Sequence, residues 1–341
     1  METKQIKIMS ADDNIRALEE VADILRQGGT VGIPTETVYG LAANAYDSQA
    51  VAKIFTAKGR PQDNPLIVHI ADMEMLPVLA EEVPESAKKL AEAFWPGPLT
   101  MVLKRTDKIP ASVSAGLDTV AVRMPSNEVA REIIRAADLP LAAPSANISG
   151  RPSPTTAQHV IDDLDGKIDA IVISGDCEVG VESTVILLAD GQQRLLRPGG
   201  ITHEQLESVI GKVEIDSSVL SSELQTKVSS PGMKYKHYSP KTKIVIIEGN
   251  SEKFCDYVNQ KSEKCAAMCF SEDKENISVP AIVYGNAFDD MSQARELFDA
   301  LRLTDSLGVD VVYAHSPRKT GVGLAVYNRM LRAAAFEVIT L

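Results

Sequence analysis

Apolar residues recur at helical spacing in four stretches of the chain. The first covers residues 14–27, where Leu18 and Leu25 share one helical face and two glycines follow, as is typical of a helix and its end. The other helices are expected over residues 78–94, 293–302 and 324–335. Elsewhere the apolar runs are short or alternate, which favours strands.

Short apolar runs between Pro- and Gly-rich turns predict these strands. In the first two thirds of the chain they read TVGIP, LIVHI, LTMVLK, TVAVRM, AIVIS and STVILL. In the last third, KIVIIEG, CAAMCF, AIVYG and VDVVYA alternate with helical stretches, which is the pattern of a parallel α/β sheet. We therefore predict an α/β protein, with an α+β-like first domain over residues 1–211, a linker over 212–242 and a smaller α/β domain over 243–341.

Composition agrees with two globular domains. A length of 341 residues suits two domains, and 44% hydrophobic with 24% charged residues is ordinary for a globular chain. The net charge of -12 argues against a protein that coats nucleic acid, because such proteins are usually basic. The four cysteines form no C-x-x-C pair and are expected to be buried, reduced thiols.

Several familiar sequence signals are missing. No stretch has the apolar core of a signal peptide or the length of a membrane span, so we expect a cytoplasmic location. Walker A, G-x-S-x-G and H-E-x-x-H motifs are also missing. If the protein handles a nucleotide, it does so by another route.

Polar side chains follow the first two predicted strands. Thr35 comes after TVGIP, and its hydroxyl either holds a small polar ligand or caps a helix. Lys58 and Arg60 flank a glycine in a Pro-rich segment. Paired cations on a stiff loop suit phosphate or carboxylate recognition, with a solvated basic turn as the alternative. His69 lies within an apolar strand, where a structural role is more usual.

The strand TVAVRM and the segment PLAAPSANISGRPSPT carry further polar groups. Alternation places Thr119 and Arg123 on one face of the strand, which predicts either a polar site or the exposed face of an edge strand. The segment offers Ser145, Asn147 and Ser153 among small residues, which let the backbone approach a ligand and donate neutral hydrogen bonds.

Strand ends thus repeatedly deliver hydroxyls and cations. Ser183 starts the strand STVILL, and Arg197 ends another strand. These groups suit a site that positions and neutralises anions more than one that runs acid-base chemistry.

The segment SPGMKYKHYSP, residues 230–240, is unusual for a linker, because it combines cations and aromatic residues without any acid. Flexible linkers are commonly rich in Gly and Ser. We expect this segment to fold over the site as a lid that touches a ligand through Tyr238 or its neighbours, with a solvated basic linker as the alternative.

Seven motifs resemble, in order, those of a YrdC-like domain: PTETVYGL, KGRP with NPLIVHI, FWPGPLT, VAVRMP, APSANISGRPSPT, ESTV and LRPG. With SPGMKYKHYSP and GVGLAVYNRM, the whole chain resembles the long, two-domain form of the L-threonylcarbamoyladenylate synthase family. The resemblance implies a twisted sheet with helices around a positively lined cavity, followed by a smaller Rossmann-like domain. It also implies an enzyme that joins L-threonine, bicarbonate and ATP into threonylcarbamoyl-AMP and releases pyrophosphate. The product would serve the modification of the adenosine beside the anticodon in certain tRNAs.

The resemblance also implies which residues form the site. Lys58 and Arg60 are the catalytic candidates, since their charges would stabilise the phosphates during the reaction, and Arg123 would pair with the threonine carboxylate. The threonine side would comprise Thr35, His69, Arg123, Ala143 and Ser183. The ATP side would comprise Lys58, Arg60, Asn64, Thr119, Ser145, Asn147, Ser153, Arg197 and Tyr238.

Magnesium bound mainly through ATP is the implied cofactor, and no protein ligand to a metal is predicted. The implied partners are the small-molecule substrates and downstream tRNA threonylcarbamoyl-transfer proteins, while direct tRNA contact stays open and no membrane contact is expected. One alternative is a module that binds RNA without making an adenylate, although the net charge of -12 counts against it. Another is a carbamoyl-transfer enzyme of hydrogenase maturation, whose acylphosphatase-like and zinc-finger regions are not seen in this sequence.

Overall fold

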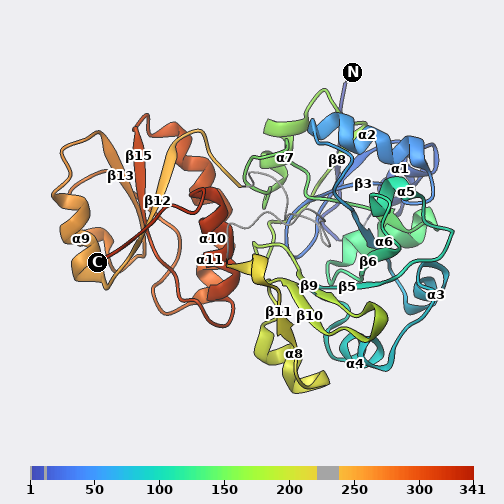
Figure 1. The fold of residues 1–341 in the computed structure, drawn as a ribbon. Coiled ribbons are helices and arrows are strands. Elements are labelled where there is room, and N and C mark those ends of the chain that lie inside the picture. Colours follow the sequence, from blue (N-terminus) through green and yellow to red (C-terminus); the bar gives the residue numbers. More distant parts are fainter. Residues whose placement is uncertain (1, 11–13, 221–237) are drawn as a thin grey trace.

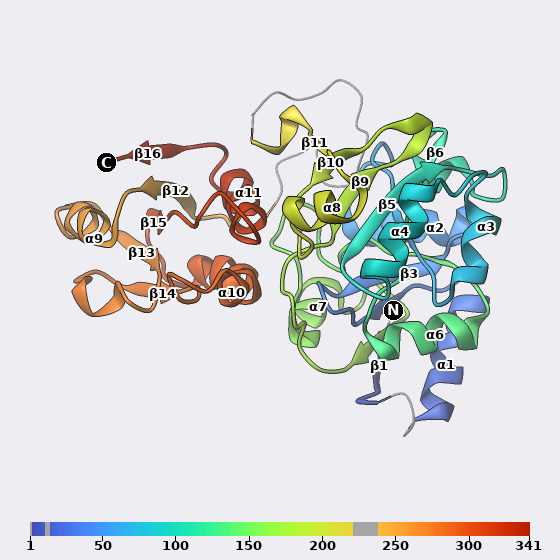
Figure 2. The same cartoon turned by 90° about the horizontal axis from the view of Figure 1, so that it is seen from below.

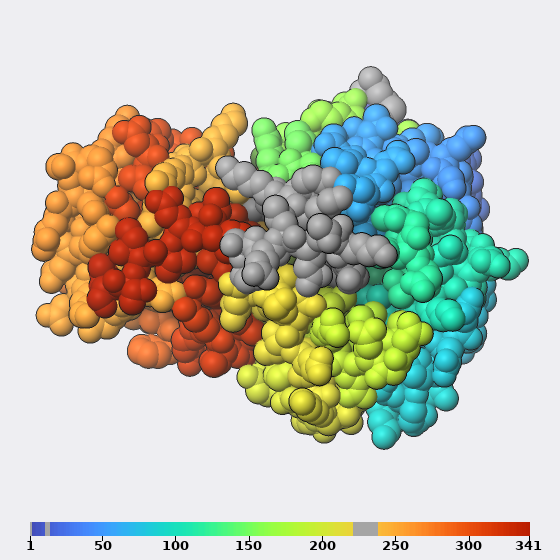
Figure 3. Space-filling model, viewed as in Figure 1, coloured from blue at the N-terminus to red at the C-terminus, as the bar shows by residue number. Residues whose placement is uncertain are grey.

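A computed structural model describes residues 2–10, 14–220 and 238–341. These residues form a larger lobe, coloured blue to yellow in Figure 1, and a smaller lobe, coloured orange to red. The space-filling view shows the two lobes joined side by side (Figure 3). Within the described ranges, no helix combines the length and the apolar character that crossing a membrane requires.

The larger lobe is built on a mixed sheet of 11 strands, counted in the described residues. The strands are β1 (Lys4–Lys7), β2 (Val31–Ile33), β3 (Gly40–Asn44), β4 (Ile67–His69), β5 (Leu99–Lys104), β6 (Thr119–Arg123), β7 (Leu141–Ala142), β8 (Ala170–Ile173), β9 (Thr184–Leu187), β10 (Arg194–Arg197) and β11 (Glu214–Ile215). Their order is β1-β8-β2-β3-β7-β4-β6-β5-β9-β10-β11. Parallel and antiparallel pairs are mixed in this sheet, which confirms the predicted α+β-like character of this part.

Helices cover the sheet of the larger lobe. They are α1 (Ile15–Arg26), α2 (Ser48–Lys58), α3 (Leu76–Leu79), α4 (Glu85–Phe94), α5 (Ala111–Ser114), α6 (Glu128–Ala137), α7 (Ala157–Leu164) and α8 (His203–Ile210). Helix α1 buries Leu18 and Leu25, as its periodicity predicts. The single helix predicted over residues 78–94 is wrong: it is divided into α3 and α4, because Pro84 disfavours a helical conformation in the residue before it.

The smaller lobe contains a parallel sheet of five strands with helices on both faces (Figure 2). Its elements are β12 (Lys243–Glu248), α9 (Ser251–Asn259), β13 (Cys265–Cys269), β14 (Ala281–Val283), α10 (Asp290–Leu303), β15 (Val311–His315), α11 (Gly323–Ala333) and β16 (Val338–Thr340). The strand order is β14-β13-β15-β12-β16. This three-layer arrangement confirms the predicted Rossmann-like fold.

Both faces of this second sheet are buried, because side chains alternate along each strand. In β12, Ile244 and Ile246 pack in the cluster formed with α10 and α11, whereas Val245 and Ile247 pack in the cluster formed with α9. The cysteines are free and buried, as expected: Cys177, Cys255, Cys265 and Cys269.

Helices α10 and α11 also face the larger lobe (Figures 1 and 2). Val38 and Val181 of the larger lobe share one apolar cluster with Phe298 of α10. Gly180 approaches α10 so closely that a Cβ there would lie 2.3 Å from the Cα of Arg295, and its φ is +79°, so this contact needs glycine. The two lobes therefore meet through a packed interface.

Candidate functional site

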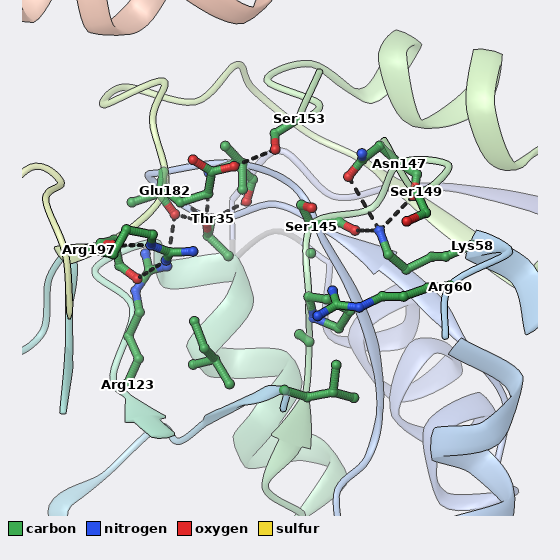
Figure 4. Close-up of a pocket in the computed structure, with 18 of the residues that line it drawn as sticks. Thr35, Lys58, Arg60, Arg123, Ser145, Asn147, Ser149, Ser153, Glu182 and Arg197 are labelled. Atoms are coloured by element: carbon green, nitrogen blue, oxygen red, sulfur yellow. Dashed lines mark hydrogen bonds between the residues drawn. The ribbon is translucent and has the colours of Figure 1, made fainter. Parts of the chain in front are cut away.

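A cavity of about 750 Å³, counting the space at its mouth, opens in the larger lobe (Figure 4). It lies at the ends of β4, β6 and β10, beside the end of α2 and the loops after β2 and β7. Its polar and charged lining comprises Thr35, Thr37, Lys58, Arg60, His69, Arg123, Ser145, Asn147, Ser149, Arg151, Ser153, Glu182, Ser183, Arg197 and Tyr238.

Every residue predicted for the site lines this cavity except Asn64 and Thr119. Asn64 is fully buried next to it, and its main-chain oxygen accepts a hydrogen bond from Arg60 at 3.5 Å. Thr119 begins β6 whereas Arg123 ends it, and four residues of strand span roughly 13 Å. The alternation of β6 therefore places Thr119 on the right face but not at the cavity.

Lys58 binds the loop that carries Ser145 and Asn147. Its ammonium donates to the main-chain oxygens of both residues, at 2.6 Å for Asn147, and Figure 4 shows the side chain directed into this loop. Only 2% of Lys58 is exposed, so a solvated turn is wrong for this residue. Burial, followed by the nearby charge of Arg60, lowers the pKa of Lys58 well below its usual value.

Thr35 lies in the loop between β2 and β3 and precedes no helix, so the alternative of a helix cap is wrong. Its hydroxyl donates to the main-chain oxygen of Val38 at 2.6 Å and lies 2.9 Å from the hydroxyl of Thr37. The loop is fixed further by a hydrogen bond from the amide of Tyr39 to the main-chain oxygen of Pro154 at 2.8 Å. These contacts hold a row of hydroxyls along the cavity wall.

Arg123 is buried at the end of β6, which lies between β4 and β5. The alternative prediction, that Arg123 lies on the exposed face of an edge strand, is therefore wrong. One terminal nitrogen lies 2.7 Å from Glu36 Oε2, and both side chains are 4% exposed. The other donates to the hydroxyl of Thr37 at 2.8 Å, and Nε donates to the main-chain oxygen of Gly97 at 3.3 Å. Any carboxylate ligand placed at Arg123 would therefore compete with Glu36.

His69 presents a neutral imidazole to the cavity. Burial, followed by the charge of Arg123, lowers the pKa of His69 to about 3. Its Nδ1 has no hydrogen-bond partner among the residues that the structure describes. Near neutral pH, Nδ1 can therefore donate or accept one hydrogen bond with a ligand, according to its tautomer, and the ring adds no charge to the cavity.

Arg197 and Ser183 form the opposite wall, where Figure 4 shows Arg197 beside Glu182. Arg197 donates to the main-chain oxygen and the hydroxyl of Ser183, both at 3.1 Å. Burial, with the charge of Arg329 next in size, lowers the pKa of Arg197 to about 10, so it keeps its charge at neutral pH. Glu182 accepts a hydrogen bond from the hydroxyl of Ser153 at 2.5 Å.

Comparison with known proteins gives the family. The family described as "Telomere recombination" matches residues 23–199, and "Threonylcarbamoyl-AMP synthase, C-terminal domain" matches residues 201–335. Threonylcarbamoyl-AMP synthase of Pyrococcus abyssi is 47% identical over 327 residues, covering 93% of this chain and 94% of its own length. This chain belongs to the threonylcarbamoyl-AMP synthase family.

A further relative and a solved structure agree along the whole chain. Threonylcarbamoyl-AMP synthase of Bacillus subtilis is 45% identical over 347 residues, covering 99% of this chain and 100% of its own. The crystal structure of P. abyssi Sua5 complexed with L-threonine has a TM-score of 0.91 and 41% identity, with full coverage of both chains. The resemblance inferred from the motifs is confirmed.

Sequence reasoning did not assign four charged residues that lie in or beside the cavity lining, namely Glu36, Arg151, Glu182 and Arg329. Glu36 neutralises Arg123, and Arg329 of the smaller lobe pairs with Glu182 at 3.0 Å. No sequence signal pairs Glu36 with Arg123. For Arg329 the sequence does hold a signal: it lies at helical spacing from Val326 on an otherwise apolar face of α11, which indicates a buried arginine that needs a partner.

The lid predicted over residues 230–240 lies outside the described residues, apart from its last three. Of these, Tyr238 lines the cavity and its ring centroid lies 5.2 Å from that of Phe298. The amide of Ser239 donates to the main-chain oxygen of Gly150, a cavity residue, at 2.9 Å. The predicted role of Tyr238 at the nucleotide stays a prediction.

Proposed function

We propose that this chain joins L-threonine, bicarbonate and ATP into threonylcarbamoyl-AMP, with release of pyrophosphate. The observation that carries this function is that residues from six of the seven motifs, together with Tyr238, line one cation-rich cavity. Membership of the threonylcarbamoyl-AMP synthase family across both lobes supports the same activity. The P. abyssi relative, described in complex with L-threonine, supports an amino acid as one substrate.

The chemistry requires positioning more than a covalent enzyme intermediate. The amine of threonine and bicarbonate form a carbamate and water. A carbamate oxygen then attacks the α-phosphorus of ATP, a new P–O bond forms, and the bond to pyrophosphate breaks. Catalysis of such a step rests on proximity and on stabilisation of the charge that develops on the phosphates.

The cavity supplies groups for both halves of this reaction. We assign the phosphates to Arg60 and Arg197, because both bring positive charge to the lining. Lys58 would act through the loop that it holds, by fixing the loop's hydroxyl and amide groups toward ATP. Neutral His69 and the Arg123 guanidinium would bind threonine, with the substrate carboxylate competing with that of Glu36.

Magnesium would reach this site with the nucleotide. Among the described residues, no group of three or more His, Cys, Asp or Glu side chains is placed to hold a metal ion. Glu182, which lines the cavity, is already paired with Arg329. The described residues therefore offer no cage of carboxylates, and we infer that magnesium would be held by the phosphates, whose negative charge it would reduce.

The product would pass to proteins that transfer the threonylcarbamoyl group to the adenosine beside the anticodon in tRNA. A cytoplasmic location, expected for such a role, also stays a prediction. Isotopically labelled bicarbonate tests the synthase activity directly. The label should enter an AMP adduct only when threonine and ATP are both present, and a labelled nucleotide formed without threonine would contradict the proposal.

A further inference from the structure

Helix α11 of the smaller lobe carries an arginine that is entirely buried against the larger lobe. The side chain of Arg329 is 0% exposed. Its Nε donates to Glu182 Oε2 at 3.0 Å, and its terminal nitrogens donate to the main-chain oxygens of Pro198 at 2.5 Å and Glu182 at 3.2 Å. Arg329 therefore binds both the segment that enters β9 and the segment that leaves β10.

These two segments form one wall of the cavity. Glu182, Ser183 and Arg197 belong to its lining, and Arg197 binds Ser183 through two hydrogen bonds. The segments lie so close that a Cβ at Gly199 would be 2.2 Å from the amide nitrogen of Thr184. Because they are tied together in this way, a displacement of one segment displaces the other.

Glu182 connects this wall with the loop on the nucleotide side. Burial alone would raise the pKa of Glu182, but the charges of Arg329 and Arg197 outweigh burial and keep that pKa below its usual value. The ionised carboxylate accepts the hydrogen bond of Ser153 at 2.5 Å. A charged acceptor makes this bond stronger than a neutral one would.

We propose that Arg329 is a positioning residue for ATP, because it holds Glu182 in the place that orients Ser153 and Arg197 toward the nucleotide. This inference rests on the proposed function and gives the second domain a task in the reaction. Within the described part of the chain, Arg329 makes no hydrogen bond to the threonine-side residues, and Ser183 is the one of them that belongs to the wall that it holds. Loss of the Arg329 side chain should therefore weaken the binding of ATP more than the binding of threonine.

The test compares R329M with R332M. Arg332 lies three residues further along α11 and donates to the main-chain oxygen of Ser218 at 3.1 Å, a contact with a residue that is not part of the cavity lining. R329M should raise the KM for ATP about tenfold and the KM for threonine less than about threefold, and R329K should recover part of the loss. R332M should leave both KM values within about twofold.

E182Q provides a second variant, which keeps the inference testable if R329M does not fold. E182Q should also raise the KM for ATP. The KM for ATP of R329M/E182Q should be no higher than that of the more impaired single variant, because both substitutions break the same connection. Equal losses for ATP and threonine, a comparable loss in R332M, or additive losses in the double variant would overturn the inference.

If the wild-type protein forms no threonylcarbamoyl-AMP, the proposed function is wrong, but this result does not test the positioning role of Arg329. The affinity for ATP, measured by calorimetry on the same variants, then decides the positioning role. An unchanged Kd in folded R329M overturns it, and a Kd raised about tenfold supports it.

Discussion

Replacing Glu36 with Gln should lower stability and strengthen threonine binding at the same time. The charges of Glu36 and Arg123 are 2.7 Å apart and almost fully buried. At an effective dielectric constant of 20, their attraction is about 6 kcal/mol. Part of this offsets the cost of removing both charges from water, and breaking one partner of such a pair usually costs about 3–5 kcal/mol. We expect E36Q to lower the free energy of unfolding by about 3 kcal/mol, since Gln keeps the shape and one acceptor.

Threonine binding should change in the opposite direction, because E36Q removes the carboxylate that competes for Arg123. A gain of about tenfold in affinity, or about 1.4 kcal/mol, is expected. Urea denaturation and calorimetry with threonine measure the two effects. E178Q, which removes an exposed carboxylate, should change stability by less than about 0.5 kcal/mol. If E36Q weakens threonine binding while the fold persists, Arg123 does not receive the substrate carboxylate.

Three further predictions concern buried ionisable side chains. K58M leaves the loop carbonyls without their donor, so kcat/KM for ATP should fall about tenfold or more in steady-state assays, and an unchanged value would refute the role of Lys58 in holding the loop. An unfolded chain protonates His69 near pH 6.5 while the folded chain keeps its pKa near 3, so stability should fall below pH 6.5, by about 2 kcal/mol at pH 5. In urea denaturation at pH 5 and pH 7, H69Q should lack this component, and equal pH dependence in both proteins would contradict it. D163N removes the buried carboxylate that pairs with Arg151 at 2.8 Å and Arg302 at 2.9 Å. In urea denaturation it should lower the free energy of unfolding by about 3 kcal/mol. A loss below about 1 kcal/mol would show that Asp163 adds little to stability.

Local patterns predicted most of the elements, because helix and strand periodicities depend on neighbouring residues. The apolar face of residues 14–27 became α1, and the alternation of TVAVRM became β6. Breaks in regular structure were harder to predict. Pro84, for example, interrupts a stretch whose periodicity alone suggested one helix.

The candidate site was predicted from motifs, but its ion pairs were not. Glu36 and Arg123 belong to elements that only the folded sheet brings together, and neither sequence neighbourhood marks the other as a partner. Arg329 belongs to the other lobe, so its contact with Glu182 depends on how two domains pack. The strand pattern likewise gave the face of Thr119 but not its distance from the cavity.

The measurement that tests the central claim most directly is pyrophosphate release from ATP by the purified protein, with threonine and bicarbonate each omitted in turn and the nucleotide products separated and weighed by mass spectrometry. The account predicts release only when both are present, together with AMP that carries a threonylcarbamoyl group. Release that is indifferent to threonine, or no release in the complete mixture, would contradict it.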